Sequence, residues 1–297
     1  MEIGVVGLGK MGGQIAEKLS QERFKVFGYD QNSELYDDSS FSFETVNDID
    51  ALLNKFTEKK VLWVMVPSGE PTNKTIIDLS KKLEPGDVII DGGNSYYKDS
   101  IENSVICKNK DIEFIDCGTS GGVWGLENGF CLTIGGNKKI YESLLSLFET
   151  LSTQESKGGL YVGESGSGHF VKMIHNGIEY GMMQSIAEGF SILKSKKEFD
   201  LNLSEISSNW KSGSVIQSWL VDLISEELKA DKELSEYSSK VSDSGEGRWT
   251  IKESIDLSVP IPSIYASISE RFNSRLDNSF SGKILSAMRR AFGGHKN

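Results

Sequence analysis

Four polar residues between positions 172 and 179 have the types and the spacing for proton transfer. Lys172, His175, Asn176 and Glu179 follow one another at i, i+3, i+4 and i+7. On a helix, these positions lie within an arc of roughly 100°. An amine and a carboxylic acid in one desolvated cleft suit general acid–base chemistry, because burial lowers the pKa of an amine and raises that of an acid. His175 and Asn176 are better suited to binding oxygen atoms.

The remainder of this stretch indicates that the helix is buried and that its polar stripe faces a cleft. The other residues are mostly apolar: Phe170, Val171, Met173, Ile174, Ile178, Met182 and Met183. Gly177 and Gly181 each cost about 1 kcal/mol of helix stability against alanine, and they allow another backbone or a ligand to come close. The alternative interpretation is a solvated face, with Lys172 and Glu179 at the surface.

A glycine-rich turn near the N-terminus is the second candidate site. Gly7, Gly9 and Gly12 form a GxGxxG pattern between a short apolar run and a helical pattern, the context that dinucleotide binding requires. Gly7 permits a tight turn, Gly9 lets the backbone approach a pyrophosphate, and Gly12 lets helix and strand pack closely. The predicted cofactor-binding turn is Gly7, Leu8, Gly9, Lys10, Met11 and Gly12. The alternative is a glycine-rich turn without a ligand.

Asp30 bears on the choice of cofactor. It ends a second predicted strand, about 18 residues beyond Gly12. An acid at this place hydrogen-bonds the ribose hydroxyls of the adenosine, and its charge repels a 2′-phosphate. No arginine follows directly, so the sequence predicts NAD in preference to NADP. A turn-forming or helix-capping acid is the alternative.

Short apolar runs that alternate with helical patterns must position these residues. The predicted strands are 3–6, 25–29, 61–66, 88–90, 112–117 and 130–134, and helical spacing covers 10–19, 47–56, 70–83, 95–109 and 138–151. This alternation predicts a parallel sheet covered on both faces. Beyond residue 165 the pattern is helical, with a long helix at 168–197 and shorter ones at 203–209, 214–229, 247–257, 262–276 and 280–292. We therefore predict an α/β, doubly wound, Rossmann-like domain over residues 1–164 and an all-α domain over residues 165–297.

Composition excludes several classes of protein. The 297 residues include 43 acidic and 32 basic ones, for a formal net charge of −11. This charge argues against binding to nucleic acid and to an anionic membrane surface. The longest apolar run, 61–66, is about a third of the roughly 20 residues that span a bilayer. Three cysteines without a CxxC pair argue against a disulfide framework or a metal site, and they favour the cytoplasm.

The motifs together resemble one enzyme family. They are KMIHNGIEYGMMQ (172–184), DGGNS (91–95), GTSGG (118–122), GLGKMG (7–12), SGEGRWT (244–250) and RRAFGGH (289–295). These runs are similar to those of decarboxylating 6-phosphogluconate dehydrogenase, over essentially the whole chain. The chain is much shorter than the long form of that family, so it resembles the short form. The resemblance implies that hydride transfer oxidises the C3 hydroxyl of 6-phosphogluconate, that CO2 leaves, and that the enol is protonated to ribulose 5-phosphate without a metal.

The resemblance also implies roles for single residues. Lys172 matches the general base, which takes the hydroxyl proton and then assists decarboxylation, and Glu179 matches the acid that protonates the enol carbon. The implied substrate contacts are Asn94, which would also touch the nicotinamide, Ser120, Gly121 and Gly122 at the carboxylate, His175 and Asn176 at the sugar hydroxyls, and Tyr180 at the phosphate. Val66, Pro67 and Ser68 match the loop that lines the cofactor. The alternatives are a flexible turn at 120–122 and a proline that merely ends a strand.

The phosphate of the substrate calls for guanidinium groups, because their fork of donors matches its oxygen atoms. Arg271 matches the family's arginine before the C-terminal region, and Arg275 is a less favoured substitute. One departure stands at Ser244, where the long form has a phosphate-binding lysine. The phosphate contact is therefore open at this position, with Arg248 or Arg290 as candidates to replace it.

The C-terminal tail carries the last implied contacts. Arg289 and His295 have the spacing of the family's tail arginine and histidine, and that tail reaches into the partner subunit's site. This implies a homodimer or homotetramer in which the tail completes the neighbouring site. The alternative is favourable positive charge at the end of a helix.

Two other functions fit parts of the pattern. A different β-hydroxyacid dehydrogenase, such as a 3-hydroxyisobutyrate type, would share the lysine and the glycine turn. It would not need Arg289, His295 or the HNGIEYG run. A non-catalytic NAD-binding sensor of the same fold would be marked by loss of Lys172 or Glu179, and both are present.

Overall fold

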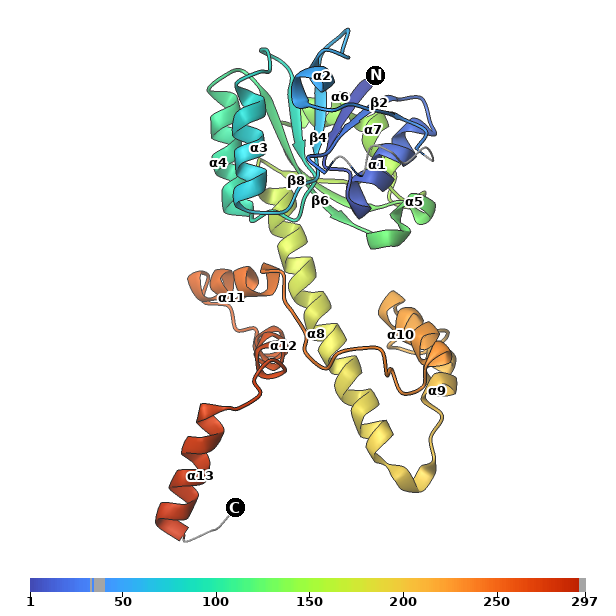
Figure 1. Cartoon of the computed structure of the whole chain (residues 1–297), viewed down its shortest axis with the longest axis vertical. Helices are drawn as coiled ribbons and strands as arrows, with labels where there is room; N and C mark the ends of the chain where they lie inside the picture. Colours follow the sequence, from blue (N-terminus) through green and yellow to red (C-terminus); the bar gives the residue numbers. More distant parts are fainter. Residues whose placement is uncertain (33, 35–40, 294–297) are drawn as a thin grey trace. The chain divides into compact units, whose positions relative to one another are not determined.

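The chain divides into two compact units. The computed structural model describes residues 1–32, 34 and 41–293, and the units are Met1–His175 and Asn176–Asn297. The division falls inside the helix α8 (Ser167–Ser195), the longest helix of the described part of the chain (Figure 1). Residue 164, where we predict the domain boundary, follows directly after the last strand of the first unit.

In the described part of the chain, eight strands of the first unit form one sheet in the order β3-β2-β1-β4-β5-β6-β7-β8. They are β1 (Glu2–Val6), β2 (Lys25–Tyr29), β3 (Glu44–Thr45), β4 (Val61–Val64), β5 (Val88–Asp91), β6 (Glu113–Ser120), β7 (Cys131–Gly136) and β8 (Leu160–Gly163). The strands from β3 to β6 are parallel, and the order turns back between β1 and β4. This is the doubly wound arrangement that the alternating pattern predicts.

Helices cover both faces of this sheet (Figure 1). Those of the first unit are α1 (Lys10–Ser20), α2 (Ile49–Leu53), α3 (Glu70–Ser80), α4 (Tyr97–Lys108), α5 (Gly125–Asn128), α6 (Lys138–Ser143) and α7 (Leu145–Leu151). Successive residues of a strand point to opposite faces, so Leu62 and Val64 pack under α2, α3 and α4, whereas Val61 and Trp63 pack under α1 and α7. Burial on both faces explains why these strands are continuous apolar runs.

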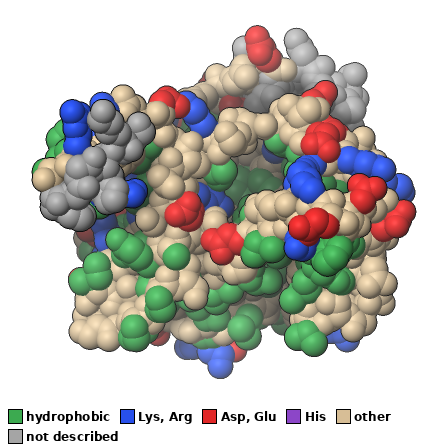
Figure 2. Space-filling view, turned by 90° about the horizontal axis from the view of Figure 1, so that it is seen from below, with side chains coloured by type: hydrophobic (Ala, Val, Ile, Leu, Met, Phe, Trp, Pro, Cys, Tyr) green, Lys and Arg blue, Asp and Glu red, His purple; other side chains and the backbone are tan. Residues whose placement is uncertain are grey.

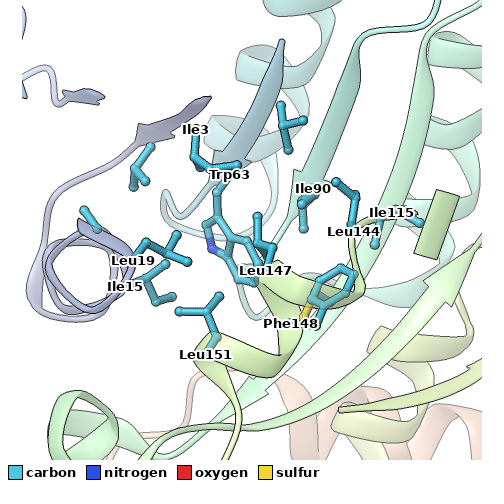
Figure 3. Close-up of a cluster of buried hydrophobic side chains, with 14 of the residues drawn as sticks. Ile3, Ile15, Leu19, Trp63, Ile90, Ile115, Leu144, Leu147, Phe148 and Leu151 are labelled. Atoms are coloured by element: carbon cyan, nitrogen blue, oxygen red, sulfur yellow. The ribbon is translucent and has the colours of Figure 1, made fainter. Parts of the chain in front are cut away.

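The face under α1 and α7 holds the larger of the two buried clusters (Figure 3). Trp63 lies at its centre and is fully buried. The labelled side chains around it come from the strands, from both helices and from the residue before α7: Ile3, Ile15, Leu19, Ile90, Ile115, Leu144, Leu147, Phe148 and Leu151. This packing fixes the start of α1, and therefore the glycine turn before it, against the sheet.

The edge of the sheet differs from the prediction in two ways. β7 runs antiparallel to β6, because the segment 121–130 is shorter than the dozen or more residues that a parallel crossover needs. β3 and β8 are not among the predicted strands. β3 has two residues, too few for a periodic signal, and β8 is a short run that directly follows Gly158 and Gly159.

The second unit is helical in the described part of the chain, as predicted. Beyond α8 its helices are α9 (Leu203–Trp210), α10 (Trp219–Ala230), α11 (Glu246–Asp256), α12 (Pro262–Asn273) and α13 (Phe280–Gly293). α9 packs against α10, and α11 packs against α12. Among the described residues, no helix has the length and apolar character that crossing a bilayer requires.

Candidate functional site

A cavity of about 1020 Å³ opens beside the carboxyl ends of β1, β2, β4 and β5. A ligand binds at this place in doubly wound sheets, because the strand order turns back there and leaves a crevice. The cavity wall includes most of the predicted cofactor-binding residues: Gly7, Gly9, Lys10, Met11, Gly12, Asp30, Val66, Pro67, Ser68 and Asn94. Leu8 is the exception, since its side chain is buried in the core beneath α1.

The three glycines of the turn meet three different steric demands. Gly7 has φ +98° and donates its N–H to the Tyr29 carbonyl at 2.7 Å. A Cβ on Gly12 would lie 1.9 Å from the Gly7 carbonyl oxygen, so only glycine fits between helix and strand. A Cβ on Gly9 would meet no atom within 4 Å and would enter open space at the cavity wall. The packing of the chain does not require a glycine at position 9, but the missing side chain leaves room for a ligand in the cavity.

Asp30 faces the same turn. Its Oδ2 accepts the N–H of Leu8 at 2.7 Å, and its Oδ1 accepts the N–H of Asn32 at 2.8 Å. A carboxylate has about four acceptor positions, so these two bonds leave Asp30 capacity for hydroxyl donors in the cavity. Besides Lys10, three further lysines line the cavity: Lys74, Lys81 and Lys82. Lys81 pairs with Asp78 at 2.7 Å, and Lys82 pairs with Asp50.

The polar stripe of α8 is more buried than a solvated face would be. Lys172 is 9% exposed and Asn176 is 7% exposed, while Glu179 is half-buried and His175 is exposed. Lys172 Nζ lies 3.4 Å from Nδ1 of His175. A Cβ on Gly118 of β6 would lie 2.4 Å from Cβ of Lys172, so the Gly118 backbone packs directly against the Lys172 side chain of α8. The stripe can therefore present a desolvated amine.

The apolar side of α8 shows the opposite of what we expected. Val171, Ile178, Met182 and Met183 are between 36% and 51% exposed in the single chain, whereas Met173 is buried. The prediction that the apolar residues are buried is therefore wrong for these four. An apolar pattern indicates that a helix face is favourably buried. It does not indicate whether that face packs against another part of the same chain or against another chain.

Two predicted substrate-binding segments follow neighbouring strands. Ser120 ends β6, and Gly121 and Gly122 follow with φ +146° and +54°, values that favour glycine. Asn94 follows β5, the strand beside β6, and lines the cofactor cavity. Among the described residues, no group of three or more His, Cys, Asp and Glu side chains has the arrangement of a metal site.

A second polar group forms in the helical unit around Tyr180. The guanidinium of Arg271 lies 3.6 Å from the centre of the Tyr180 ring, and its Nη1 donates to the Ser242 carbonyl at 2.8 Å. The Ser244 Oγ lies 3.3 Å from the Tyr180 hydroxyl. The tertiary structure thus brings together the three positions that we expect near a phosphate: Tyr180 of α8, Arg271 of α12 and Ser244 before α11.

The tail residues are only partly described. Arg289 lies on α13, and its side chain is exposed. His295 lies outside the described residues.

Comparison with known proteins decides the family. Residues 2–163 match the family model described as the NAD binding domain of 6-phosphogluconate dehydrogenase, and residues 168–296 match the 6-phosphogluconate dehydrogenase C-terminal domain. The chain belongs to the 6-phosphogluconate dehydrogenase family. Within it, the protein YqeC of Bacillus subtilis is 40% identical over 99% of this chain and 98% of its own. The NAD(+)-dependent, decarboxylating 6-phosphogluconate dehydrogenase of Haloferax volcanii is 36% identical over 100% and 98%.

Solved structures agree with this family assignment. The 6-phosphogluconate dehydrogenase of Plasmodium falciparum, determined with its cofactor NADP+ and its substrate, superposes with a TM-score of 0.84 at 28% identity. It covers all of this chain, which spans 65% of that longer protein. The 3-hydroxyisobutyrate dehydrogenase of Mycobacterium tuberculosis has a TM-score of 0.74 at 17% identity, over 93% of this chain and 94% of its own, a likeness in fold alone.

In this 6-phosphogluconate dehydrogenase family member, two acids near Tyr180 are not among the residues predicted from the sequence. Glu246 is 2% exposed, and its Oε2 accepts the Ser244 hydroxyl at 2.8 Å. Asp243 accepts two bonds from Arg248, at 2.7 and 3.0 Å, and two from Arg275, at 3.2 and 3.1 Å. Arg248 and Arg275, two of the four arginines that we considered for the phosphate, therefore already have a carboxylate partner. Both acids stand in the run DSGEGR, which could have pointed to them.

The Asp243 carboxylate should contribute measurably to stability. Hydrogen bonds from Arg248, and then from Arg275, lower the pKa of Asp243 to about 2. Its stabilisation is therefore complete above pH 4 and lost as the pH falls toward 2. We expect Asp243→Asn to lower the free energy of unfolding by about 1–2 kcal/mol at pH 7, after allowing for the half-exposed Arg248. Urea unfolding at pH 7 and pH 3 measures this loss, which should shrink at pH 3.

Asp277→Asn is the matched control for this measurement. Asp277 pairs with Lys240 at 3.0 Å, but its side chain is 82% exposed. Exposed pairs contribute at most about 1 kcal/mol. An equal loss in the two variants, or a loss in Asp243→Asn that does not depend on pH, would contradict the role of the two arginines.

Proposed function

We propose that this chain is an NAD-linked, decarboxylating 6-phosphogluconate dehydrogenase that works without a metal. The observation that carries the proposal is the burial of Lys172 and Asn176 on the polar stripe of α8. It occurs in a chain whose dinucleotide cavity includes Asn94, a predicted substrate contact. The names of the Haloferax and Plasmodium relatives support the substrate. Reduction of NAD in the presence of 6-phosphogluconate, followed by absorbance at the NADH band, tests it directly.

The cavity fits a dinucleotide. The open space beside Gly9 admits a pyrophosphate close to the backbone, and the start of α1 offers N–H groups to it. Asp30 would accept hydrogen bonds from the adenosine ribose, and Val66, Pro67 and Ser68 would line the nicotinamide end with Asn94. The bound nicotinamide would supply the acceptor for the hydride that leaves C3 of the substrate.

Lys172 and Glu179 would carry the proton transfers. In its neutral form, the Lys172 amine takes the proton of the C3 hydroxyl. The resulting ammonium then donates to the C3 oxygen and stabilises the negative charge that develops there as CO2 leaves. Glu179, in its protonated form, donates a proton to the carbon that has lost the carboxylate. His175 and Asn176 would hold the sugar hydroxyls.

Two groups of residues would hold the ends of the substrate. Ser120, Gly121 and Gly122 would bind the carboxylate through a hydroxyl and backbone N–H groups. Tyr180 and Arg271, which stack on each other, would bind the phosphate, with Ser244 as a neutral donor. Arg289 and His295 would add positive charge from the tail.

The preference for NAD over NADP would depend on Asp30. Replacing its carboxylate with a neutral amide in Asp30→Asn removes the repulsion toward a 2′-phosphate, and the cavity lysines remain. We expect the ratio of kcat/KM for NAD to that for NADP to fall by about tenfold, which corresponds to about 1.4 kcal/mol. Steady-state rates with each cofactor measure it. A wild-type protein that prefers NADP by tenfold or more would overturn the assignment of NAD.

We also propose that the protein works as a homodimer or homotetramer in the cytoplasm. Figure 2 shows groups of hydrophobic side chains between charged ones on one face of the molecule. In the helical unit, the exposed apolar residues include Ile178, Met182, Phe280, Leu285 and Met288. Such surface favours burial against another chain.

Three unpaired cysteines suit a reducing compartment. We keep 1–164 and 165–297 as the domains, the second supplying most of the substrate contacts and the subunit contacts.

A further inference from the structure

A cluster of polar side chains lies inside the first unit, beside the start of α8. Asp91 at the end of β5, Asp116 in β6, Ser100 in α4 and His169 in α8 are each at most 1% exposed. The mechanism above uses none of them. Burying charged or polar groups is costly unless they are paired, so such a cluster needs a reason.

Asp116 accepts two hydrogen bonds from backbone N–H groups at the start of α8. Its Oδ1 accepts the N–H of Gly166 at 2.6 Å, and its Oδ2 accepts the N–H of His169 at 2.9 Å. A carboxylate at this end of a helix is favourable, because it satisfies N–H groups that have no partner within the helix. Thr133 of β7 adds a bond from its hydroxyl to the Gly168 carbonyl at 3.0 Å. The turn that precedes Lys172 is thereby tied to two strands.

The His169 side chain joins this turn to α4. Its Nδ1 lies 2.7 Å from the Ser100 hydroxyl of α4. Its Nε2 is buried and has no hydrogen-bond partner among the described residues, and the same holds for Oδ2 of Asp91. Burial raises the pKa of Asp91, and the charge of His169 is the largest influence that opposes this rise. Asp91 is the register partner of Asp116 on the adjacent strands β5 and β6, so its side chain lies on the same face of the sheet, beside the carboxylate that binds the His169 N–H. His169 Nε2 and Asp91 Oδ2 are therefore two buried atoms without partners in one cluster.

We propose that His169 is a positioning residue that, together with Asp91, fixes the turn carrying Asn94 relative to the helix carrying Lys172. Asp91 begins the segment 91–95, and its Oδ1 accepts the Gly93 N–H at 3.1 Å, so its placement sets the backbone next to Asn94. His169 and Lys172 are i and i+3 on one helix, with Cβ atoms about 5–6 Å apart. The inference rests on the proposed function, since it concerns the groups that would contact substrate and nicotinamide.

Misplacing a reacting group by about 1 Å can cost a hundredfold in rate. This sets the expected effect. His169→Asn keeps a polar atom near the Nδ1 position for Ser100 but has none at Nε2. We expect its kcat to fall about 10- to 100-fold. His169→Gln reaches the Nε2 position, and we expect its kcat to stay within about fivefold of wild type.

Asp91→Asn completes the experiment. It keeps the shape of Asp91 and removes the charge, and we expect a loss of kcat like that of His169→Asn. The double variant should lose about as much as either single variant, because residues that act through one link are not additive. Ser104→Ala on the exposed side of α4 is the matched control and should keep the wild-type kcat. The dissociation constant for NAD, from quenching of tryptophan fluorescence, should stay within about twofold in all variants, since His169 and Asp91 are absent from the cavity wall.

The outcomes separate the alternatives. Equal kcat in His169→Asn and His169→Gln, additive losses in the double variant, or losses that follow NAD affinity would each overturn the positioning role. If His169→Asn does not fold, Asp91→Asn decides, and a wild-type kcat in it would overturn the proposal. A wild-type protein that binds NAD but does not reduce it with 6-phosphogluconate would overturn the proposed function, and this inference with it.

Discussion

Lys172→Met is expected to lower kcat with 6-phosphogluconate by about 10³- to 10⁴-fold while NAD still binds. Methionine matches the length and apolar stem of lysine, so the contact with Gly118 on β6 is kept and only the amine is lost. The substitution removes the amine that we propose as the acceptor of the hydroxyl proton and as the donor to the C3 oxygen as CO2 leaves. Steady-state kinetics measures the loss, and fluorescence titration measures NAD affinity.

Lys194→Met is the matched control. It is the same substitution on the same helix, at a residue that is 42% exposed and pairs with Glu233 at 2.7 Å. We expect its kcat to stay within about twofold, because an exposed ion pair contributes little. A Lys172→Met protein that remains active would show that the base is a different residue. A protein that also loses NAD would show that Lys172 has a structural role.

Gly9→Ala is the second prediction with a large effect. Its Cβ would enter the open space at the cavity wall and meet no atom of the chain. We expect unchanged thermal stability and a KM for NAD raised by at least about tenfold, because the added methyl group would occupy the place where the backbone approaches the pyrophosphate. Gly12→Ala should do the reverse and destabilise the fold, since its Cβ would lie 1.9 Å from the Gly7 carbonyl oxygen.

Gly189→Ala completes this glycine series. Gly189 lies within α8, and its Cβ would also meet no atom within 4 Å. A helical glycine without such contacts should gain up to about 1 kcal/mol on replacement by alanine, with no change in KM for NAD. Differential scanning calorimetry and initial rates over a range of NAD concentrations distinguish the three variants. A Gly9→Ala protein with the wild-type KM would mean that the ligand does not approach the turn.

Much of the first unit could be predicted from local patterns. Strands that are buried on both faces must be continuous apolar runs, so β1, β2, β4 and β5 are visible without a structure. The glycine turn is visible because its backbone geometry at Gly7 and its packing at Gly12 exclude side chains. The stripe from Lys172 to Glu179 is visible because α-helical periodicity places these residues on one side.

The pairing of strands and of charged groups, in contrast, depends on contacts between segments that are distant in the sequence, and so does the exposure of side chains. The antiparallel pairing of β7 with β6 depends on the length of the segment that joins them. β8 is too short to show a periodic pattern in the sequence. Arg248 and Arg275 were open candidates for a phosphate until the fold placed Asp243 between them.

The sequence by itself determined the fold class, the dinucleotide turn and the set of residues available for acid–base chemistry, because these depend on the near neighbours of each residue along the chain. Only the tertiary structure decided which of these side chains are buried and what they touch. It buries Lys172 and exposes the apolar side of the same helix. It also encloses His169 with Asp91 and Asp116. Burial and ion pairing depend on segments far apart in the sequence, and no local pattern records them.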